Sequence, residues 1–289
     1  MSGFLSRVRT YFLCKILYQQ LFSKILPTPI KNIQLRDNQD TFLMQRPFIV
    51  RIKGSEIMSL LNFNEGKNKI IEVDGIRYAR LPIQTHVITG QDNITDVVQQ
   101  YAAKHIQEND ILFISEKAVA CSQKRAIPLD KIHPRRLARI LARFVYKSPY
   151  GIGLSIPETM EMALRECGTP RILFAAFISA IGKLLGKRGW FYTIAGPRAA
   201  SIDGPAPYTL PPYNKCVVLG PDKPNDVARE VAQHLGIVCV IVDVNNLGAK
   251  ILGTSDFSIN RTHITRILRD NPLGQASQCT PMGIIRQIE

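Results

Sequence analysis

Two polar side chains directly follow the most apolar segment of the sequence. Residues 237–242 are apolar on both faces, as in a strand buried inside a sheet, and Asp243 and Asn245 come next. An extended backbone points residues two apart to the same side. A carboxylate with an amide oxygen suits Mg²⁺ or Mn²⁺, which phosphate oxygens and water also help to bind. A turn that closes a hairpin into residues 250–252 explains the same residues, because Asp and Asn favour turns.

A second acidic residue, Asp203, lies in a segment with glycines on both sides. Gly196 and Arg198 precede it, and Gly204 follows it. Glycine allows a ligand to approach the backbone closely, and the guanidinium of Arg198 is suited to phosphate. Asp203 would then supply another metal ligand. An ordinary Asp-Gly turn accounts for the same residues.

Three cations lie in or just after the last part of an expected strand at residues 110–120. Lys117, Lys124 and Arg125 suit the phosphates of a nucleotide, although simple solvent exposure is the alternative. No segment has the spacing of a Walker A loop, a metalloprotease helix or a serine hydrolase elbow, and the five histidines are isolated in the sequence. We therefore predict neither a P-loop enzyme nor a hydrolase.

Composition and charge limit the class of protein. The chain has 289 residues, of which 45% are hydrophobic, and its 37 Lys and Arg exceed its 23 Asp and Glu by 14. A chain of this size and composition folds around its own core, and its charge favours anionic partners. Six scattered cysteines without a CxxC pair predict a reducing, cytoplasmic location rather than a disulfide framework. Nucleic acid is disfavoured, because no basic motif is interleaved with aromatic residues.

The first residues differ in character from the rest. Residues 1–31 hold five Lys or Arg, no acidic residue and apolar residues at helical spacing, which predicts a basic amphipathic helix in an extension of residues 1–45. The charges interrupt the apolar run, so neither a transmembrane helix nor a secretory signal is predicted. Residues 1–26 suit an anionic membrane surface, which would make the protein peripheral to a membrane; packing on the body or on a second subunit is the alternative.

Residues 46–289 predict one α/β domain, with an α+β arrangement or two subdomains as alternatives. Asp74-Gly75 predicts a hairpin, Asp92, Asn93 or Thr95 can cap a helix that reaches about residue 105, and Pro134 opens a basic helix. The apolar stretch at residues 172–185 predicts a buried helix. The other expected strands are residues 48–52, 110–120, 189–196, 216–219, 237–242 and 283–286.

Taken in order, several short segments resemble the coenzyme F-420 glutamate ligase family over residues 78–256. The segments are Leu81-Pro82-Ile83, Gly90-Gln91-Asp92, residues 109–117, Ala195-Gly196, Pro211-Pro212 and Val242-Asp243-Val244-Asn245. The resemblance implies an α/β fold of mixed sheets with flanking helices, in a homodimer. It also implies that GTP and two divalent metal ions support the joining of glutamate to a carboxylate of a deazaflavin precursor by a γ-glutamyl amide bond.

The resemblance also assigns roles to residues. Lys117 and Arg125 match cations of the family and are the expected catalytic residues, whereas Asp243 and Asn245 match its metal-binding Asp-x-Asn. Lys117, Lys124, Arg125, Gly196 and Arg198 are expected to bind the nucleotide. Arg198 stands where the family has an aspartate, and Gln123-Lys124 stand where it has Glu-Gly, so the chain resembles a divergent member. Asp203 is the nearby carboxylate that would replace the missing metal ligand.

The leading hypothesis is an enzyme, a γ-glutamyl ligase that uses GTP or ATP with Mg²⁺ or Mn²⁺. It would convert a small-molecule carboxylate into an acyl phosphate, which the amine of glutamate or a similar compound then attacks. The alternative is a catalytically lapsed module that binds a phosphorylated ligand and is recruited to a membrane surface. Convergence of Asp243, Asn245 and Asp203 favours the ligase.

Overall fold

The computed structural model describes residues 64–145, 152–187, 189–207, 209–245, 248–274 and 278–288. All of them belong to one of the two units into which the chain divides, residues 51–289. The predicted extension of residues 1–45, its helix and the predicted strand at residues 48–52 lie outside the described residues.

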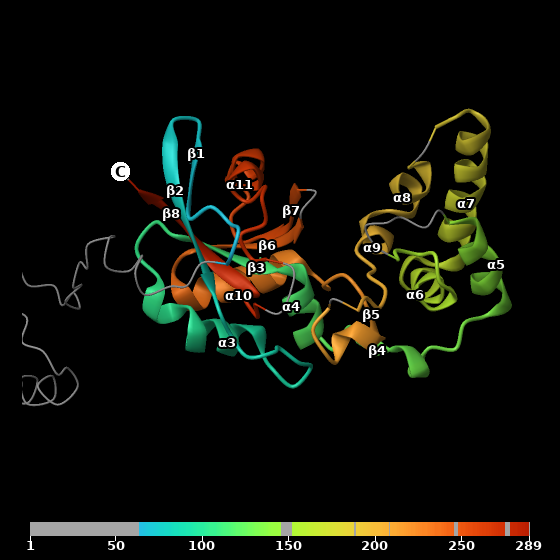
Figure 1. Ribbon diagram of the computed structural model, residues 1–289, viewed down its shortest axis with the longest axis horizontal. Coiled ribbons are helices and arrows are strands. Elements are labelled where there is room, and N and C mark those ends of the chain that lie inside the picture. The colour runs from blue at the N-terminus through green and yellow to red at the C-terminus, as the bar shows by residue number, and fades with distance from the viewer. Residues whose placement is uncertain are drawn as a thin grey trace, which may run out of the picture. The chain divides into compact units, whose positions relative to one another are not determined.

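Six strands form one mixed sheet, and this confirms the predicted α/β class (Figure 1). Across the sheet the strands are β1 (Ile70–Val73), β2 (Ile76–Ile83), β8 (Met282–Ile288), β3 (Ile111–Ser115), β6 (Val238–Asn245) and β7 (Gly248–Thr254). β3 and β6 are parallel, and the other neighbouring pairs are antiparallel. The prediction that residues 237–242 form an interior strand is confirmed, because β6 lies between β3 and β7 and its central residues are buried.

Alternate residues of the central strands serve two different cores. Leu112 and Ile114 of β3 pack on one face with α3 (Ile94–Tyr101) and α10 (Pro224–Leu235). Phe113 points to the other face and packs with α11 (Arg261–Ile267). This alternation follows from the two-residue period of a strand, and it explains why the central strands are apolar throughout.

Two local signals in the sequence are confirmed. Asp74 and Gly75 have φ of 56° and 79°, which a tight hairpin turn requires, and Val73 pairs with Ile76 across it. Asn93 caps α3, since its side-chain oxygen accepts a hydrogen bond from the Thr95 N–H. After α3 the chain continues in the short 3₁₀ helix η1 (Ala103–His105).

A second core joins five helices to a two-stranded sheet. The helices are α5 (Arg136–Phe144), α6 (Pro157–Cys167), α7 (Thr169–Leu184), α8 (Trp190–Ala195) and α9 (Pro197–Ala200), and the antiparallel strands are β4 (Ala126–Pro128) and β5 (Cys216–Val218). The remaining elements are α4 (Glu116–Ser122), η2 (Leu129–Lys131) and η3 (Tyr213–Lys215). The predicted strands at residues 216–219 and 283–286 are confirmed as β5 and β8.

Two predicted strands need correction. The strand expected at residues 110–120 ends at Ser115, because Glu116 begins α4. The strand expected at residues 189–196 is wrong: it is α8, bounded by Gly189 and Gly196, which have φ of 91° and 90°. Its aromatic and β-branched residues favour strands in general, but a tertiary contact decides here. The ring of Trp190 packs so closely on α7 that a Cβ added at Gly182 would lie 3.0 Å from it.

The prediction of a buried helix at residues 172–185 is correct about the helix and wrong about its burial. In α7 the side chains of Ile172 and Ala175 are buried, but Leu173, Phe174 and Phe177 are exposed. The absence of charged residues predicts that a segment is apolar, but it does not predict how much of the helix surface other elements cover. α7 is covered on one side only.

No single helix among the described residues is long and apolar enough to cross a membrane. α6 and α7 reach that length and composition only as a pair, and they are bent by 117° relative to each other.

We expect Gly283→Ala to lower the free energy of unfolding by about 1–3 kcal/mol, the usual range for overpacking a core. A Cβ at this position of β8 would lie 2.6 Å from Phe113 Cζ and 2.9 Å from the Leu81 carbonyl oxygen. Urea denaturation measures the loss. In a Phe113→Leu background, which removes Cζ, the same substitution should cost less; an equal cost in both backgrounds would show that the ring contact is not responsible.

Candidate active site

Two acidic residues lie near the carboxyl end of the parallel strand pair. Ser115, the last residue of β3, pairs with Val242 of β6; Glu116 follows as the first residue of α4, and Asp243 follows within β6. Parallel register therefore places Glu116 and Asp243 at the same edge of the sheet, which is where α/β proteins bind ligands. Glu116 is only 3% exposed.

Lys117 connects this edge to the segment that contains Asp203. Its Nζ lies 2.9 Å from Glu116 Oε1 and 2.9 Å from Asp203 Oδ2, and it donates a third hydrogen bond of 2.9 Å to the Ser201 carbonyl. The Asp203 N–H donates to the Val218 carbonyl of β5 at 2.8 Å, and the Val218 N–H donates to the Asp203 carbonyl at 2.9 Å. An ammonium has three N–H donors, so Lys117 uses all of them within the protein.

The electrostatics of the site centre on Glu116. Burial raises the pKa of the Glu116 carboxyl, the negative charges of Asp243 and Asp203 add to this rise, and Lys117 opposes it. Burial alone would lower the pKa of Lys117, but the carboxylates of Glu116 and Asp203 outweigh it and raise that pKa. Glu116 Oε2 is buried without a hydrogen-bond partner. Glu116 had no predicted role, because its place in the site depends on the long-range pairing of Ser115 with Val242.

Glu116 and Asp243, which we call the acidic edge, are the described acidic side chains that could hold a divalent cation together with the phosphates of a bound nucleotide. This metal site stays a prediction. Among the described residues no three His, Cys, Asp or Glu side chains lie close enough to hold a metal ion by themselves. Glu116 and Asp243 nevertheless supply two carboxylates, which is the usual protein share of a Mg²⁺ site that also uses phosphate and water. Asn245 Nδ2 lies 3.4 Å from Asp243 Oδ1, so these two side chains share one side of β6. Asp203 is bound to Lys117, and its role as a metal ligand stays a prediction.

The hairpin that the sequence offered as an alternative for Asp243 and Asn245 is present. β6 and β7 are antiparallel neighbours, with Asp243 opposite Lys250 and Asn245 opposite Gly248. The two interpretations are compatible, because the hairpin fixes the backbone while the side chain of Asp243 remains beside Glu116.

Arg125, one of the expected catalytic cations, is held by protein groups. Its Nε donates to the Gly220 carbonyl at 2.6 Å, and its Nη2 lies 2.5 Å from Glu166 Oε2. These bonds fasten α6 to the segment after β5. In this structure Arg125 therefore organises the surroundings of the site.

The other expected nucleotide-binding cations are more accessible. Lys124 is exposed and lies against Gly90, where an added Cβ would be 2.8 Å from Lys124 Cγ. Arg198, which follows Gly196 at the start of α9, is two-thirds exposed and makes a weak ion pair of 3.7 Å with Asp222. Arg198 is thus open to an added anion.

A model of the F420-0:Gamma-glutamyl ligase family matches residues 82–267, nearly two-thirds of the chain. The chain belongs to this family. The match includes Glu116, Lys117, Asp203 and Asp243, and membership indicates a ligase of the γ-glutamyl type. A search of curated proteins found no match to the chain.

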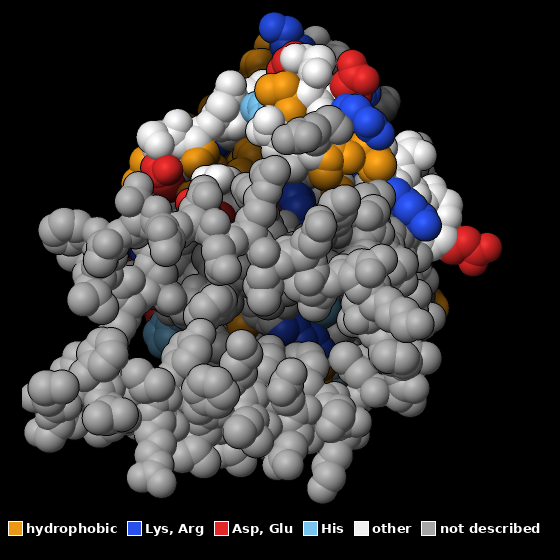
Figure 2. All heavy atoms as spheres, turned by 90° about the vertical axis from the view of Figure 1, so that its left-hand side faces the viewer, with side chains coloured by type: hydrophobic (Ala, Val, Ile, Leu, Met, Phe, Trp, Pro, Cys, Tyr) orange, Lys and Arg blue, Asp and Glu red, His pale blue; other side chains and the backbone are white. Residues whose placement is uncertain are grey.

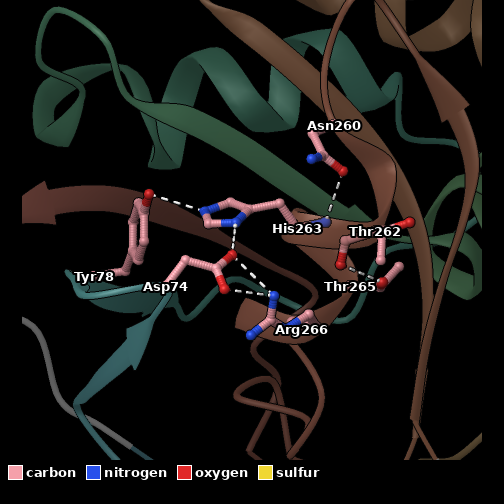
Figure 3. Close-up of polar contacts among 7 residues, drawn as sticks. All are labelled: Asp74, Tyr78, Asn260, Thr262, His263, Thr265 and Arg266. Atoms are coloured by element: carbon pink, nitrogen blue, oxygen red, sulfur yellow. Dashed lines mark hydrogen bonds and ion pairs between the residues drawn. The ribbon is translucent and has the colours of Figure 1, made fainter.

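A second polar cluster in this ligase-family chain joins the β1–β2 turn to α11. Figure 3 shows His263 between Asp74 and Tyr78: its Nδ1 lies 3.1 Å from Asp74 Oδ2, and its Nε2 lies 2.9 Å from the Tyr78 hydroxyl. Arg266 Nη1 donates to both Asp74 oxygens at 2.8 Å. Burial raises the pKa of Tyr78, and the charge of Asp74 adds to it, so the phenol stays protonated. We therefore assign the cluster a structural role.

The raised pKa of Glu116 predicts how the stability of this family member depends on pH. A carboxyl whose pKa is higher in the folded state than in the unfolded state destabilises the fold once it ionises, so its cost appears as pH rises above the ordinary value of 4.5. Glu116→Gln imitates the protonated acid. We expect its melting temperature to match the parent near pH 4 and to exceed it increasingly towards pH 7. A difference that is constant with pH would show that ionisation of Glu116 is not the cause.

Proposed function

We propose that the chain is a nucleotide- and divalent-metal-dependent ligase that joins the amine of glutamate, or of a similar compound, to a small-molecule carboxylate. The observation that carries the proposal is that Glu116 and Asp243 lie near the carboxyl end of the parallel pair, close enough for the charge of Asp243 to act on Glu116, with one buried Glu116 oxygen left without a hydrogen bond. A bound cation would compensate the charge of these two carboxylates and satisfy the unpaired oxygen.

The convergence of Asp243, Asn245 and Asp203 that was expected to distinguish the ligase from the lapsed binding module is incomplete: Asn245 lies beside Asp243, but Asp203 is bound to Lys117, and no three His, Cys, Asp or Glu side chains of the described residues gather into a metal site. Family membership is what favours the ligase.

Glu116 and Asp243 would hold Mg²⁺ or Mn²⁺, which supplies positive charge against the oxygens of a transferred phosphoryl group. Arg198 and Lys124, which are exposed, would contact the nucleotide phosphates directly. The metal ion would thus bind at the carboxylates of Glu116 and Asp243, and the phosphates would bind at the exposed cations.

Lys117 would change partners when the nucleotide binds. Its contact with Glu116 is buried, whereas the Asp203 side chain is 61% exposed and therefore easier to displace. We propose that a phosphate oxygen replaces Asp203 at Lys117, while Glu116 keeps the ammonium in place. The freed Asp203 would then be available as the further metal ligand expected from the sequence.

The reaction follows the order expected of an acid-amine ligase. An oxygen of the substrate carboxylate attacks the γ-phosphorus, the bond to the β,γ-bridging oxygen breaks, and an acyl phosphate and a nucleoside diphosphate result. The amine nitrogen then attacks the acyl carbon, the amide bond forms, and inorganic phosphate leaves while the nitrogen loses a proton. The cations of the site are needed because negative charge develops on the phosphoryl oxygens.

Phosphorus NMR tests this proposal on the full chain. The protein is incubated with GTP or ATP, Mg²⁺ or Mn²⁺, glutamate and candidate acids that include F420-0, and mass spectrometry identifies the amide. We expect stoichiometric nucleoside diphosphate, phosphate and amide for one acid. Failure to consume nucleotide with every acid, together with no effect of nucleotide on Mn²⁺ binding, would contradict the proposal. The homodimer and the preference for GTP stay predictions, which light scattering and the same assay check.

A further inference from the structure

The outer side of α7 carries large apolar side chains. Leu173, Phe177, Ala180 and Leu184 recur at intervals of four, three and four residues, so they share one side of the helix, and Phe174 lies next to them. All five are exposed, Phe177 by 62% and Leu184 by 87%. Exposed aromatic and aliphatic side chains in such a row mark an interaction surface more often than isolated ones do.

The apolar surface continues onto the end of α5. Lys183 Nζ of α7 donates to the Phe144 carbonyl at 2.7 Å, which brings the C-terminal ends of the two helices together. Phe144 itself is 70% exposed, and Ile140, one turn earlier in α5, is also exposed. We call the exposed apolar residues of both helices the α5–α7 face: Ile140, Phe144, Leu173, Phe174, Phe177 and Leu184.

Positive charge surrounds the α5–α7 face. Residues 131–157 contain six Lys or Arg, residues 168–202 contain five, and neither segment contains an Asp or Glu. Arg139, Arg143, Lys183 and Lys187 are exposed beside the apolar residues. The described side chains in Figure 2, on the side of the molecule that carries β1 and β2, instead mix Lys or Arg with Asp or Glu. The positive charge of these two segments is therefore not offset by any acidic residue within them.

We propose that the α5–α7 face binds the surface of an anionic lipid bilayer. Phe and Leu side chains would enter the boundary between headgroups and acyl chains, and the flanking Lys and Arg would contact lipid phosphates, as in other interfacial helices. A second copy of the chain is disfavoured, because a symmetric contact through this face would place Arg and Lys against Arg and Lys. Residues 1–31 are disfavoured as its cover for the same reason, since they are basic as well.

The chain's single tryptophan, Trp190, lies on the covered side of α7. It packs against Gly182, a buried residue roughly half a helical turn away from the exposed row of Leu173, Phe177 and Leu184. A reporter at the α5–α7 face therefore needs a substitution: Phe177→Trp in a Trp190→Phe background places one indole on the outer side of α7 and none in residues 1–26.

The test uses the full chain with vesicles of phosphatidylcholine and of phosphatidylcholine mixed with phosphatidylglycerol. We expect the parent to sediment with the anionic vesicles only. In the Phe177→Trp reporter variant we expect a blue shift of the indole emission and quenching of that emission by lipids brominated on their acyl chains. Phe174→Ser with Phe177→Ser should weaken partitioning by at least about tenfold, given the apolar area that the two rings would bury. Lys183→Glu should weaken binding to the anionic vesicles and reduce its dependence on salt.

Phe257→Ser is the matched control, because Phe257 is 65% exposed but lies between β7 and α11, outside this face. It should bind like the parent, and circular dichroism should show that all variants are folded. The proposal is overturned if the parent binds no vesicle, if the double Phe variant binds like the parent, or if brominated lipid fails to quench the indole of the Phe177→Trp reporter variant in bound protein. It is also overturned if the parent is a dimer, the double Phe variant is a monomer, and vesicles do not dissociate the parent dimer. That result would assign the α5–α7 face to a second copy of the chain.

Discussion

Replacing Asp243 with Asn should lower kcat/KM for ligation by at least about a hundredfold. The substitution keeps the shape of the side chain and removes one of the two carboxylates that lie near the carboxyl end of the parallel strand pair, so the site holds less negative charge for a cation. A cation that neutralises phosphoryl oxygens commonly contributes several kcal/mol to the transition state. Calorimetric titration of Mn²⁺ in the presence of nucleotide gives a second readout, which should show clearly weaker binding.

Asp256→Asn is the control for this experiment. Asp256 accepts a hydrogen bond of 2.8 Å from the Ser258 N–H in the segment before α11 and takes no part in the acidic edge. It should change neither metal binding nor activity appreciably. If Asp243→Asn and Asp203→Asn both bind Mn²⁺ as the parent does, the acidic edge is not a metal site and the proposed ligase mechanism fails with it.

Asp110→Ala should destabilise the fold by about 3–5 kcal/mol, the usual effect of leaving one partner of a buried ion pair alone. Asp110 precedes β3, and its two oxygens accept from Arg286 of β8, from Nε at 2.9 Å and from Nη2 at 2.6 Å. Both residues are buried. Without Asp110 the guanidinium would keep only its hydrogen bond to the His105 carbonyl. Guanidinium chloride denaturation measures the loss.

An exposed ion pair provides the comparison for Asp110→Ala. Asp226 and Arg229 are paired one turn apart on the surface of α10. Asp226→Ala should cost less than about 1 kcal/mol, because water solvates both charges after the substitution. If Asp110→Ala and Asp226→Ala lower the free energy of unfolding by similar amounts, burial does not increase the contribution of the Asp110–Arg286 ion pair to stability.

The sequence was most informative where a local rule and the tertiary structure agree. Residues 237–242 are apolar on both faces and form an interior strand, and Asp74-Gly75 can form only a tight turn between two alternating runs. Predictions from the sequence failed where the structure or burial of a segment depends on which other elements pack against it. Residues 190–195 have strand-forming side chains but pack as a helix on α7, and α7 itself has a partner on one side only.

The sequence predicted most residues of the candidate site, but it did not predict which of them contact one another. The Asp-x-Asn pattern pointed to Asp243, and the basic cluster pointed to Lys117. Glu116 was missed because its importance comes from register: it enters the site since Ser115 pairs with Val242, a contact across more than a hundred residues of chain. The bonds that hold Arg125 to Glu166 and the Gly220 carbonyl depend on similar long-range contacts, which a local motif does not encode.

The position of β8 has a consequence for the order in which the protein is made. β8 lies in the middle of the sheet, between β2 and β3, although Ile83 pairs with Met282 roughly 200 residues later in the chain. During synthesis β1 and β2 leave the ribosome early and remain without their central neighbour until residues 282–288 emerge. Pairings between such distant segments form slowly and leave strand edges open to other chains. A growing chain of this protein should therefore depend on chaperones until its last strand is in place.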